Sequence, residues 1–205
     1  NNKRILIDPG MLEYDETLLE QDWNNIDILL VTHKHRDHYH EPAIEQIMQN
    51  KNTCFFTTQE VQDAFPDIKA EIVKKGDKIQ QENITIEVVH AVHGYLPFLK
   101  GGNEIYENVG YIIDDGTTRA YHASDTICFP NEHTCDIIFV PISGHGLVCG
   151  YFEGALFARE TGAKAAIPIH NNNPKFPVDL NEVKQVFEKL EVPCQPLSVG
   201  ESYEL

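Results

Sequence analysis

Residues 32–38 read THKHRDH and directly follow the apolar run IDILLVT, which has the composition of a strand buried on both faces. In a turning loop, side chains two positions apart can project to the same side. His33 and His35 can therefore bind one ion, while Asp37 and His38 face a neighbouring ion. Imidazole and carboxylate ligands suit Zn²⁺ and similar divalent ions. The stretch predicts a metal centre; the alternatives are a solvated polar turn and a cap on the helix that follows.

Apolar runs alternate with helical patterns along the rest of the chain, and no linker or repeat divides it. The turn signal Asp115-Gly116 predicts a hairpin between two of the strands. Two packed sheets with helices outside accommodate this order in a single domain over residues 1–205. Strands are expected at 3–8, 26–32, 53–57, 84–93, 109–114, 118–124, 136–142, 164–170 and 195–199, and helices at 42–50, 59–65, 152–161 and 180–190.

Composition narrows the class of protein. The 205 residues are 41% hydrophobic and 23% charged, as in ordinary globular domains. No stretch approaches the ~18 apolar residues of a membrane helix. Sixteen basic against 32 acidic residues give a net charge of −16, which repels nucleic acid and anionic membranes. Five cysteines without CxxC spacing, and no signal peptide, favour a reducing compartment, so we expect a cytoplasmic protein.

Three later positions can complete the metal centre, because each lies at the end of an expected strand. They are His93, Asp125 and His170. Strand ends that gather at one edge of a sheet make a natural site. Asp125 has a second interpretation as a turn or helix cap. His90 competes with His93, and strand parity leaves that choice open; the adjacent Gly94, which permits close approach of backbone or ligand, favours His93.

The chain resembles the metallo-β-lactamase-fold superfamily, in particular the branch around ascorbate-6-phosphate lactonase and its uncharacterised relatives. The matching pieces occur in family order and span nearly the whole chain. They are ILIDPG at 5–10, THKHRDH at 32–38, AVHG at 91–94, the GYII and YHASDT strands within 110–126, DIIFVPISGH at 136–145 and AIPIHN at 166–171.

The resemblance implies an α/β fold, a four-layer αβ/βα sandwich of two mixed β-sheets with outer helices, and two metal ions. By the family pattern the first ion is bound by His33, His35 and His93, the second by Asp37, His38 and His170, and Asp125 bridges both. Two departures stand out. Ser124 replaces the usual Gly before the bridging Asp. The N-terminal strand-turn-strand of the family is also missing from residues 1–205, so we expect its sheet to lack an edge.

Three further features are candidates for roles around the metals. Asp8 resembles a carboxylate that orients metal ligands, or it simply starts the Pro9-Gly10 turn. His145, in a glycine-flanked loop, is a candidate to contact substrate or donate a proton; the alternative is an exposed loop histidine. Tyr95, Lys100 and Asn103, in the long irregular segment 94–108, are candidates to line a substrate entrance.

These inferences predict a binuclear metal-dependent hydrolase, with zinc preferred over Mn²⁺ or Fe. A metal-bound hydroxide attacks a lactone, ester or phosphorus ester, and Asp37 both ligates and can accept the proton of the nucleophile. The expected partner is a small molecule, phosphorylated or not; homo-oligomers are left open. One rival is an iron-dependent oxidoreductase, but diiron members usually carry a carboxylate at the position of His35. The other is a non-catalytic metal-binding protein, which the full ligand set disfavours.

Overall fold

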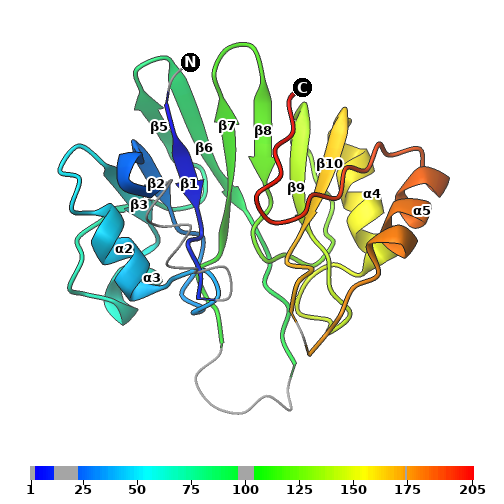
Figure 1. The fold of residues 1–205 in the computed structure, drawn as a ribbon, viewed down its shortest axis with the longest axis horizontal. Coiled ribbons are helices and arrows are strands. Elements are labelled where there is room, and N and C mark those ends of the chain that lie inside the picture. Colours follow the sequence, from blue (N-terminus) through cyan, green and yellow to red (C-terminus); the bar gives the residue numbers. More distant parts are fainter. Residues whose placement is uncertain (1–2, 12–22, 97–103, 174) are drawn as a thin grey trace. The chain divides into compact units, whose positions relative to one another are not determined.

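The computed structural model describes residues 3–11, 23–96, 104–173 and 175–205 (Figure 1). Two compact units divide the chain. The first unit comprises residues 1–77 and 101–109, and the second comprises 78–100 and 110–205. Each unit has its own β-sheet with helices beside it, which confirms the expected α/β class.

The first unit is built on a four-stranded sheet in the order β1-β2-β3-β4, and each of its described pairings is parallel. Strand β2 is buried throughout, which explains its uninterrupted apolar sequence. Leu29, Ile44 and Phe55 bring strands and helix into one apolar core. The elements are β1 (Ile5–Ile7), the 3-10 helix η1 (Trp23–Asn25), β2 (Ile28–Leu30), α2 (Glu41–Ile47), β3 (Cys54–Thr57), α3 (Gln59–Ala64) and β4 (Glu71–Ile72).

The second unit is built on a mixed six-stranded sheet in the order β10-β9-β8-β7-β6-β5. The β5–β6 and β7–β8 pairs are antiparallel, whereas β9 pairs in parallel with both β8 and β10. The strands are β5 (Lys78–Gln81), β6 (Ile84–His90), β7 (Val109–Asp114), β8 (Arg119–His122), β9 (Ile137–Pro141) and β10 (Ala165–Ile169), and the helices are α4 (Tyr151–Thr161) and α5 (Leu180–Lys189).

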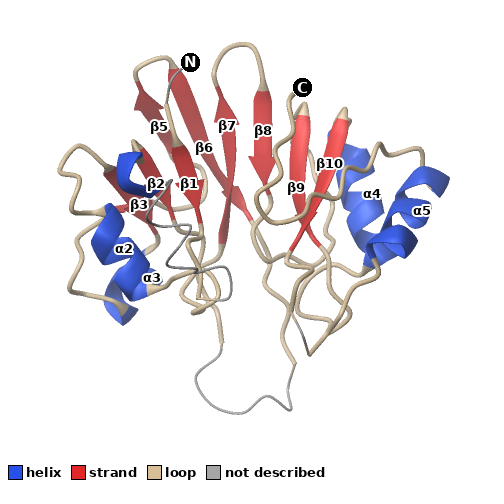
Figure 2. Cartoon of the chain, viewed as in Figure 1, coloured by secondary structure: helices blue, strands red, loops and turns tan. Residues whose placement is uncertain are grey.

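Helices α4 and α5 pack together beside the β9–β10 end of this sheet (Figure 2). Gly154 lies so close to Ile142 that a Cβ at position 154 would clash with it, so α4 approaches the end of β9 closely. Phe157 of α4 and Phe187 of α5 are both fully buried in the core. Asp179 caps α5 by accepting hydrogen bonds from the Asn181 and Glu182 amides.

Two sequence-based expectations were wrong in detail. The strand expected at 84–93 ends at His90, because the Val92 amide donates to the Thr126 hydroxyl instead of joining the sheet. The strand expected at 195–199 is reduced to one bridge between Ala166 and Cys194. Pro193 and Pro196 flank that bridge and lack the amide hydrogens that a longer ladder needs. The first correction places His93 in a loop beyond the strand.

None of the helices in the described ranges combines the length and apolar character that a membrane crossing requires.

Candidate functional site

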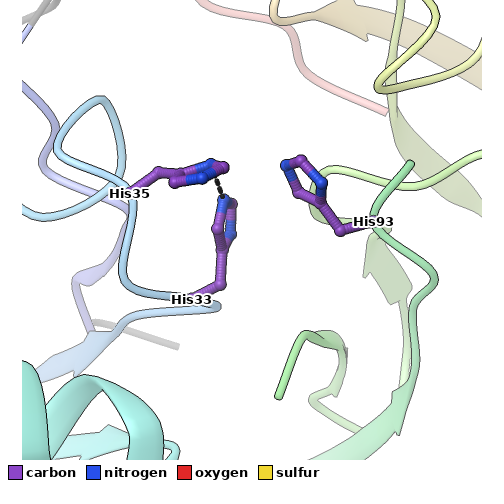
Figure 3. Close-up of side chains that lie close together, drawn as sticks. All are labelled: His33, His35 and His93. Carbon is purple, nitrogen blue, oxygen red and sulfur yellow. Dashed lines mark hydrogen bonds between the residues drawn. The ribbon is translucent and has the colours of Figure 1, made fainter. Parts of the chain in front are cut away.

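The loop after β2 carries the predicted ligands of the first unit. His33 is fully buried, and its Nε2 lies 3.2 Å from Nδ1 of His35. The two rings meet edge to face, as Figure 3 shows. Asp37 and His38 follow in the same loop, with 3.9 Å between Asp37 Oδ2 and His38 Nε2. All four predicted ligands of this unit therefore lie in one tight turn.

The spacing of the two histidine nitrogens provides a test of fit to a metal ion. Two imidazole nitrogens on one tetrahedral zinc, each with a Zn–N bond of ~2.0–2.1 Å, lie about 3.3 Å apart. The observed 3.2 Å between His33 Nε2 and His35 Nδ1 matches that separation. His33 and His35 thus fit a single ion without rearrangement of their side chains.

The carboxylate of Asp8, which follows β1, organises this loop. It accepts hydrogen bonds of 2.8 Å from the amide and from the hydroxyl of Thr32, and it lies 2.8 Å from Nδ1 of His38. The Thr32 hydroxyl in turn lies 3.0 Å from Nδ1 of His33. Since this hydroxyl donates to Asp8, it accepts from His33. One carboxylate therefore places the hydrogens of both His33 and His38 on Nδ1 and leaves Nε2 of each ring able to bind a metal.

Backbone contacts hold Asp8 against residues 32–38, which we call the motif loop. Asp8 has a φ of 51°, in the left-handed region that Asp tolerates better than most residues. The next residues follow the motif closely: the Met11 amide donates to the Arg36 carbonyl. A Cβ on Gly10 would clash with the carbonyl of Asp37, so only glycine allows this approach.

A second polar network ties Lys34 of the motif to α3. The Lys34 ammonium lies 2.6 Å from Glu60 Oε1, and Glu60 Oε2 accepts from the amides of Tyr106 and Glu107. Glu107 returns the contact by accepting from the Glu60 amide at 2.8 Å. Partial burial alone would raise the pKa of the Glu60 carboxyl. The hydrogen bonds from Lys34, Glu107 and Tyr106 outweigh burial and hold that pKa below its usual value.

The network also places one end of segment 94–108. Tyr106 and Glu107 lie at the end that leads into β7, and the Lys34 ammonium lies 5.9 Å from the centre of the Tyr106 ring. Residues 97–103 of this segment lie outside the described residues. Sequence reasoning missed the Glu60 contact, because a glutamate 26 positions beyond Lys34 carries no local signal.

The predicted ligands of the second unit gather around Asp125, which is 2% exposed. Its Oδ2 lies 3.2 Å from Nε2 of His170 and 3.7 Å from Nε2 of His93. One carboxylate oxygen thus meets two imidazole nitrogens. His93 (labelled in Figure 3) holds its Nδ1 2.7 Å from the Gly94 carbonyl, which accepts from it, so Nε2 is again the nitrogen that can bind a metal.

The structure distinguishes His90 from His93 and shows the conformation of Ser124. His90 is exposed at the end of β6 and packs near Phe129, whereas His93 lies beside Asp125. Ser124 has a φ of 61°, so it adopts the left-handed conformation for which glycine is the usual residue. The turn before Asp125 is formed with serine in place.

His145 lies in the same unit as His170. The two ring centroids are 5.3 Å apart, and the Leu147 amide donates to His145 Nδ1 at 3.0 Å. Because Nδ1 accepts, the hydrogen of the neutral ring is on Nε2, which makes Nε2 a donor. The loop is tied to the His93 segment, since the Gly94 amide donates to the Leu147 carbonyl and a Cβ on Gly94 would clash there.

Cysteine chemistry plays no part in either cluster. Burial raises the pKa of the Cys149 thiol to about 12 and that of Cys194 to about 11. Neither thiol ionises readily near neutral pH, and ionised thiolate is the form that attacks substrates or binds metals. The donors of both clusters are imidazoles and carboxylates.

Comparison with known proteins identifies the family to which the chain belongs. The model of the β-lactamase superfamily domain matches residues 1–170. A protein of Korarchaeum cryptofilum named "UPF0173 metal-dependent hydrolase" is 28% identical over all of this chain and 93% of its own length. A structure titled as a novel metallo hydrolase from Ignicoccus hospitalis has a TM-score of 0.77 at 24% identity, covering 96% of this chain and 88% of its own. The metallo-β-lactamase fold protein YhfI from Bacillus subtilis has a TM-score of 0.73 at 13% identity, covering 94% and 83%.

We predict that Asp8→Asn lowers zinc affinity about 10- to 100-fold, the usual effect of losing a partner that orients a metal ligand. Asn has a single acceptor oxygen, so it cannot accept from the Thr32 amide, the Thr32 hydroxyl and His38 Nδ1 together, as the two carboxylate oxygens of Asp8 do. Asn tolerates the φ of 51°, so the backbone should persist. Competition with a chromogenic chelator measures the affinity. Asp27→Asn, which alters a carboxylate beside Lys3 in the same unit, is the matched control. Equal zinc affinity in Asp8→Asn and wild type would refute the orienting role.

Glu60→Gln should destabilise the protein in a pH-dependent way. A carboxyl whose folded pKa is lowered stabilises the fold above its ordinary pKa of 4.5 and loses that contribution as pH falls through the lowered value. Near neutral pH we expect the free energy of unfolding of the variant to be about 1 kcal/mol lower than that of wild type. This difference between the variant and wild type should shrink steadily as the pH falls below the ordinary pKa of 4.5. Urea unfolding across that range measures it, with the exposed Glu71→Gln as control. A deficit independent of pH would contradict the assignment.

Proposed function

We infer, from the premise that this chain belongs to the β-lactamase superfamily, that it is a binuclear metal-dependent hydrolase acting on a lactone, an ester or a phosphorus ester. One observation carries the proposal. Three predicted histidine ligands have Nδ1 tied to a protein acceptor: His33 to Thr32, His38 to Asp8 and His93 to Gly94. That arrangement is how proteins prepare a histidine to bind a metal through its other nitrogen.

The proposed ligand assignment uses both clusters. His33, His35 and His93 bind the first ion, Asp37, His38 and His170 bind the second, and Asp125 bridges them. The approach of His93 and His170 to one oxygen of Asp125 supports its role as the bridge. Zinc is the proposed metal because every first-ion ligand is an imidazole apart from the shared carboxylate.

Each residue then has a chemical task. When bound, two divalent ions lower the pKa of a water ligand to about 7 and polarise the oxygen of the substrate. Asp37 accepts the proton of the nucleophile. His145 donates from Nε2 to the oxygen that becomes negative in the transition state, because its Nδ1 is occupied by the Leu147 amide.

The setting of the reaction is also a proposal. The net charge of −16 disfavours nucleic acid and supports a small-molecule substrate. No disulfide links the five cysteines, all of which belong to the described part of the chain, and this supports a cytoplasmic location.

Metal content and turnover of Asp125→Ala test the binuclear centre. Protein purified without chelator should hold about two equivalents of transition metal and hydrolyse simple esters, lactones or phosphodiesters. Asp125→Ala should hold about half as much metal and lose turnover, since the bridge serves both ions. Asp114→Ala, which removes a carboxylate paired with Arg119, should behave as wild type. An active, stable protein with about one equivalent or less would exclude the binuclear mechanism.

His145→Ala separates an oxyanion donor from a metal ligand. Loss of one such donor costs on the order of 10²- to 10³-fold in kcat, so we expect turnover to fall by that factor with metal content unchanged. Elemental analysis, thermal melting and steady-state kinetics are measured on the same preparation. Unchanged turnover would remove His145 from the proposed mechanism, and lost metal would assign it to the support of His170.

A further inference from the structure

Three rings of the second unit form a row that starts at the predicted ligand His170. The His145 ring lies 5.3 Å from the His170 ring at 84°, and the Phe176 ring lies 5.1 Å from the His145 ring at 83°. Both contacts are edge to face, the arrangement that aromatic rings favour. We call His170, His145 and Phe176 the ring row. Its outer member, Phe176, is 43% exposed.

The ring row is held by its backbone, so its geometry is built into the unit. The Leu147 amide fixes the tautomer of His145, and the Leu147 carbonyl accepts from Gly94. A Cβ on Gly146 would lie 3.8 Å from Leu96, so a further apolar side chain lies against the same turn. On the other side of the row, the Phe176 amide donates to the carbonyl of Asn173.

An aromatic side chain in this position has a use in recognition. Phe176 is a large apolar residue that remains partly in water, although it packs against a histidine next to a predicted metal ligand. Covering apolar surface of this kind is favourable because it removes that surface from water. Ligand sites commonly combine such an apolar surface with a few polar groups that set orientation. His145 Nε2–H is a polar group of that type, in contact with the same ring.

We propose that Phe176, together with His145, forms a specificity subsite for an aromatic or bulky apolar group on the acyl side of the substrate. The apolar group packs on Phe176 while the reacting oxygen accepts from His145. This inference rests on the proposed function and narrows its substrate class to esters or lactones with an apolar acyl portion.

The competing class is a phosphorylated substrate. Lys175, the exposed neighbour of Phe176 in sequence, is the cation that would attract a phosphate there. The favoured class is apolar, because the Phe176 ring lies 5.1 Å from the His145 ring, so a substrate held by His145 lies within reach of Phe176. The net charge of −16 also opposes an anion at long range. Phe176→Ala and Lys175→Ala are neighbouring variants that distinguish the two classes.

Binding is measured first, by calorimetry on zinc-loaded protein, because it does not depend on turnover. The probes are acetate, phenylacetate, inorganic phosphate and phenyl phosphate. Wild type should bind phenylacetate about 10-fold more tightly than acetate, the lower end of what one well-placed apolar group contributes. Phe176→Ala should abolish that preference, and Phe176→Leu should retain part of it. Lys175→Ala should leave it intact, as should Ile72→Ala, which truncates a residue with the same 43% exposure in β4.

Hydrolysis of methyl phenylacetate and methyl acetate is the second measurement. The ratio of the two kcat/KM values should fall about 10-fold in Phe176→Ala, and the ratio cancels any change at His145 that affects both esters alike. Equal binding of acetate and phenylacetate by wild type would overturn the inference. So would a preference that survives in Phe176→Ala or disappears in Lys175→Ala. If the phenylacetate preference depends on Phe176 but neither ester is hydrolysed, the subsite stands and the proposed hydrolase activity fails.

Discussion

The motif loop depends on the hydrogen bonds that the buried carboxylate of Asp8 accepts. Burying a charge is costly unless hydrogen bonds replace its water, and Asp8 receives them from the amide and hydroxyl of Thr32 and from His38. The parallel pairing of β1 with β2 places Ile7 opposite Leu30, and the Asp8 amide donates to the Leu30 carbonyl. This pairing brings the Asp8 carboxylate within hydrogen-bond distance of Thr32. The sheet thereby delivers a charge to the base of the loop, and the loop's histidines adopt the tautomers that this charge selects.

In the second unit, Thr126 holds together the segments that carry the predicted ligands. The Thr126 side chain accepts from the Val92 amide, while the Thr126 carbonyl accepts from the Cys149 amide. Three segments are tied together by one residue: the one that carries His93, the one that carries Asp125 and the loop that follows His145. Since Asp125 adjoins Thr126, these contacts hold the Asp125 carboxylate near His93. Each unit therefore organises its own donors.

The predicted metal ligands and the aromatic side chains next to them differ in how far they are exposed to water. The donors come from buried or half-buried positions, and in His33, His38 and His93 the second ring nitrogen is occupied by a protein acceptor. Phe176 and Tyr106 lie at the opposite extreme, because each is exposed and touches the donor-bearing loops through a single ring or cation contact. Substitutions at such exposed positions usually cost little stability.

The local sequence determined the donor-rich turn after a buried strand, the alternation of strands and helices, and the choice of imidazole and carboxylate chemistry. These features depend on residue type and on neighbours in sequence, as THKHRDH after IDILLVT illustrates. Parity along β6 could not choose between His90 and His93, because the answer depends on where the strand stops, and Thr126 sets that point from 34 positions away. The tautomers of His33 and His38, the Lys34–Glu60 pair and the His145–Phe176 contact likewise came only from the tertiary structure. Each joins side chains through space, and pairing across a fold leaves no periodic signal in the chain.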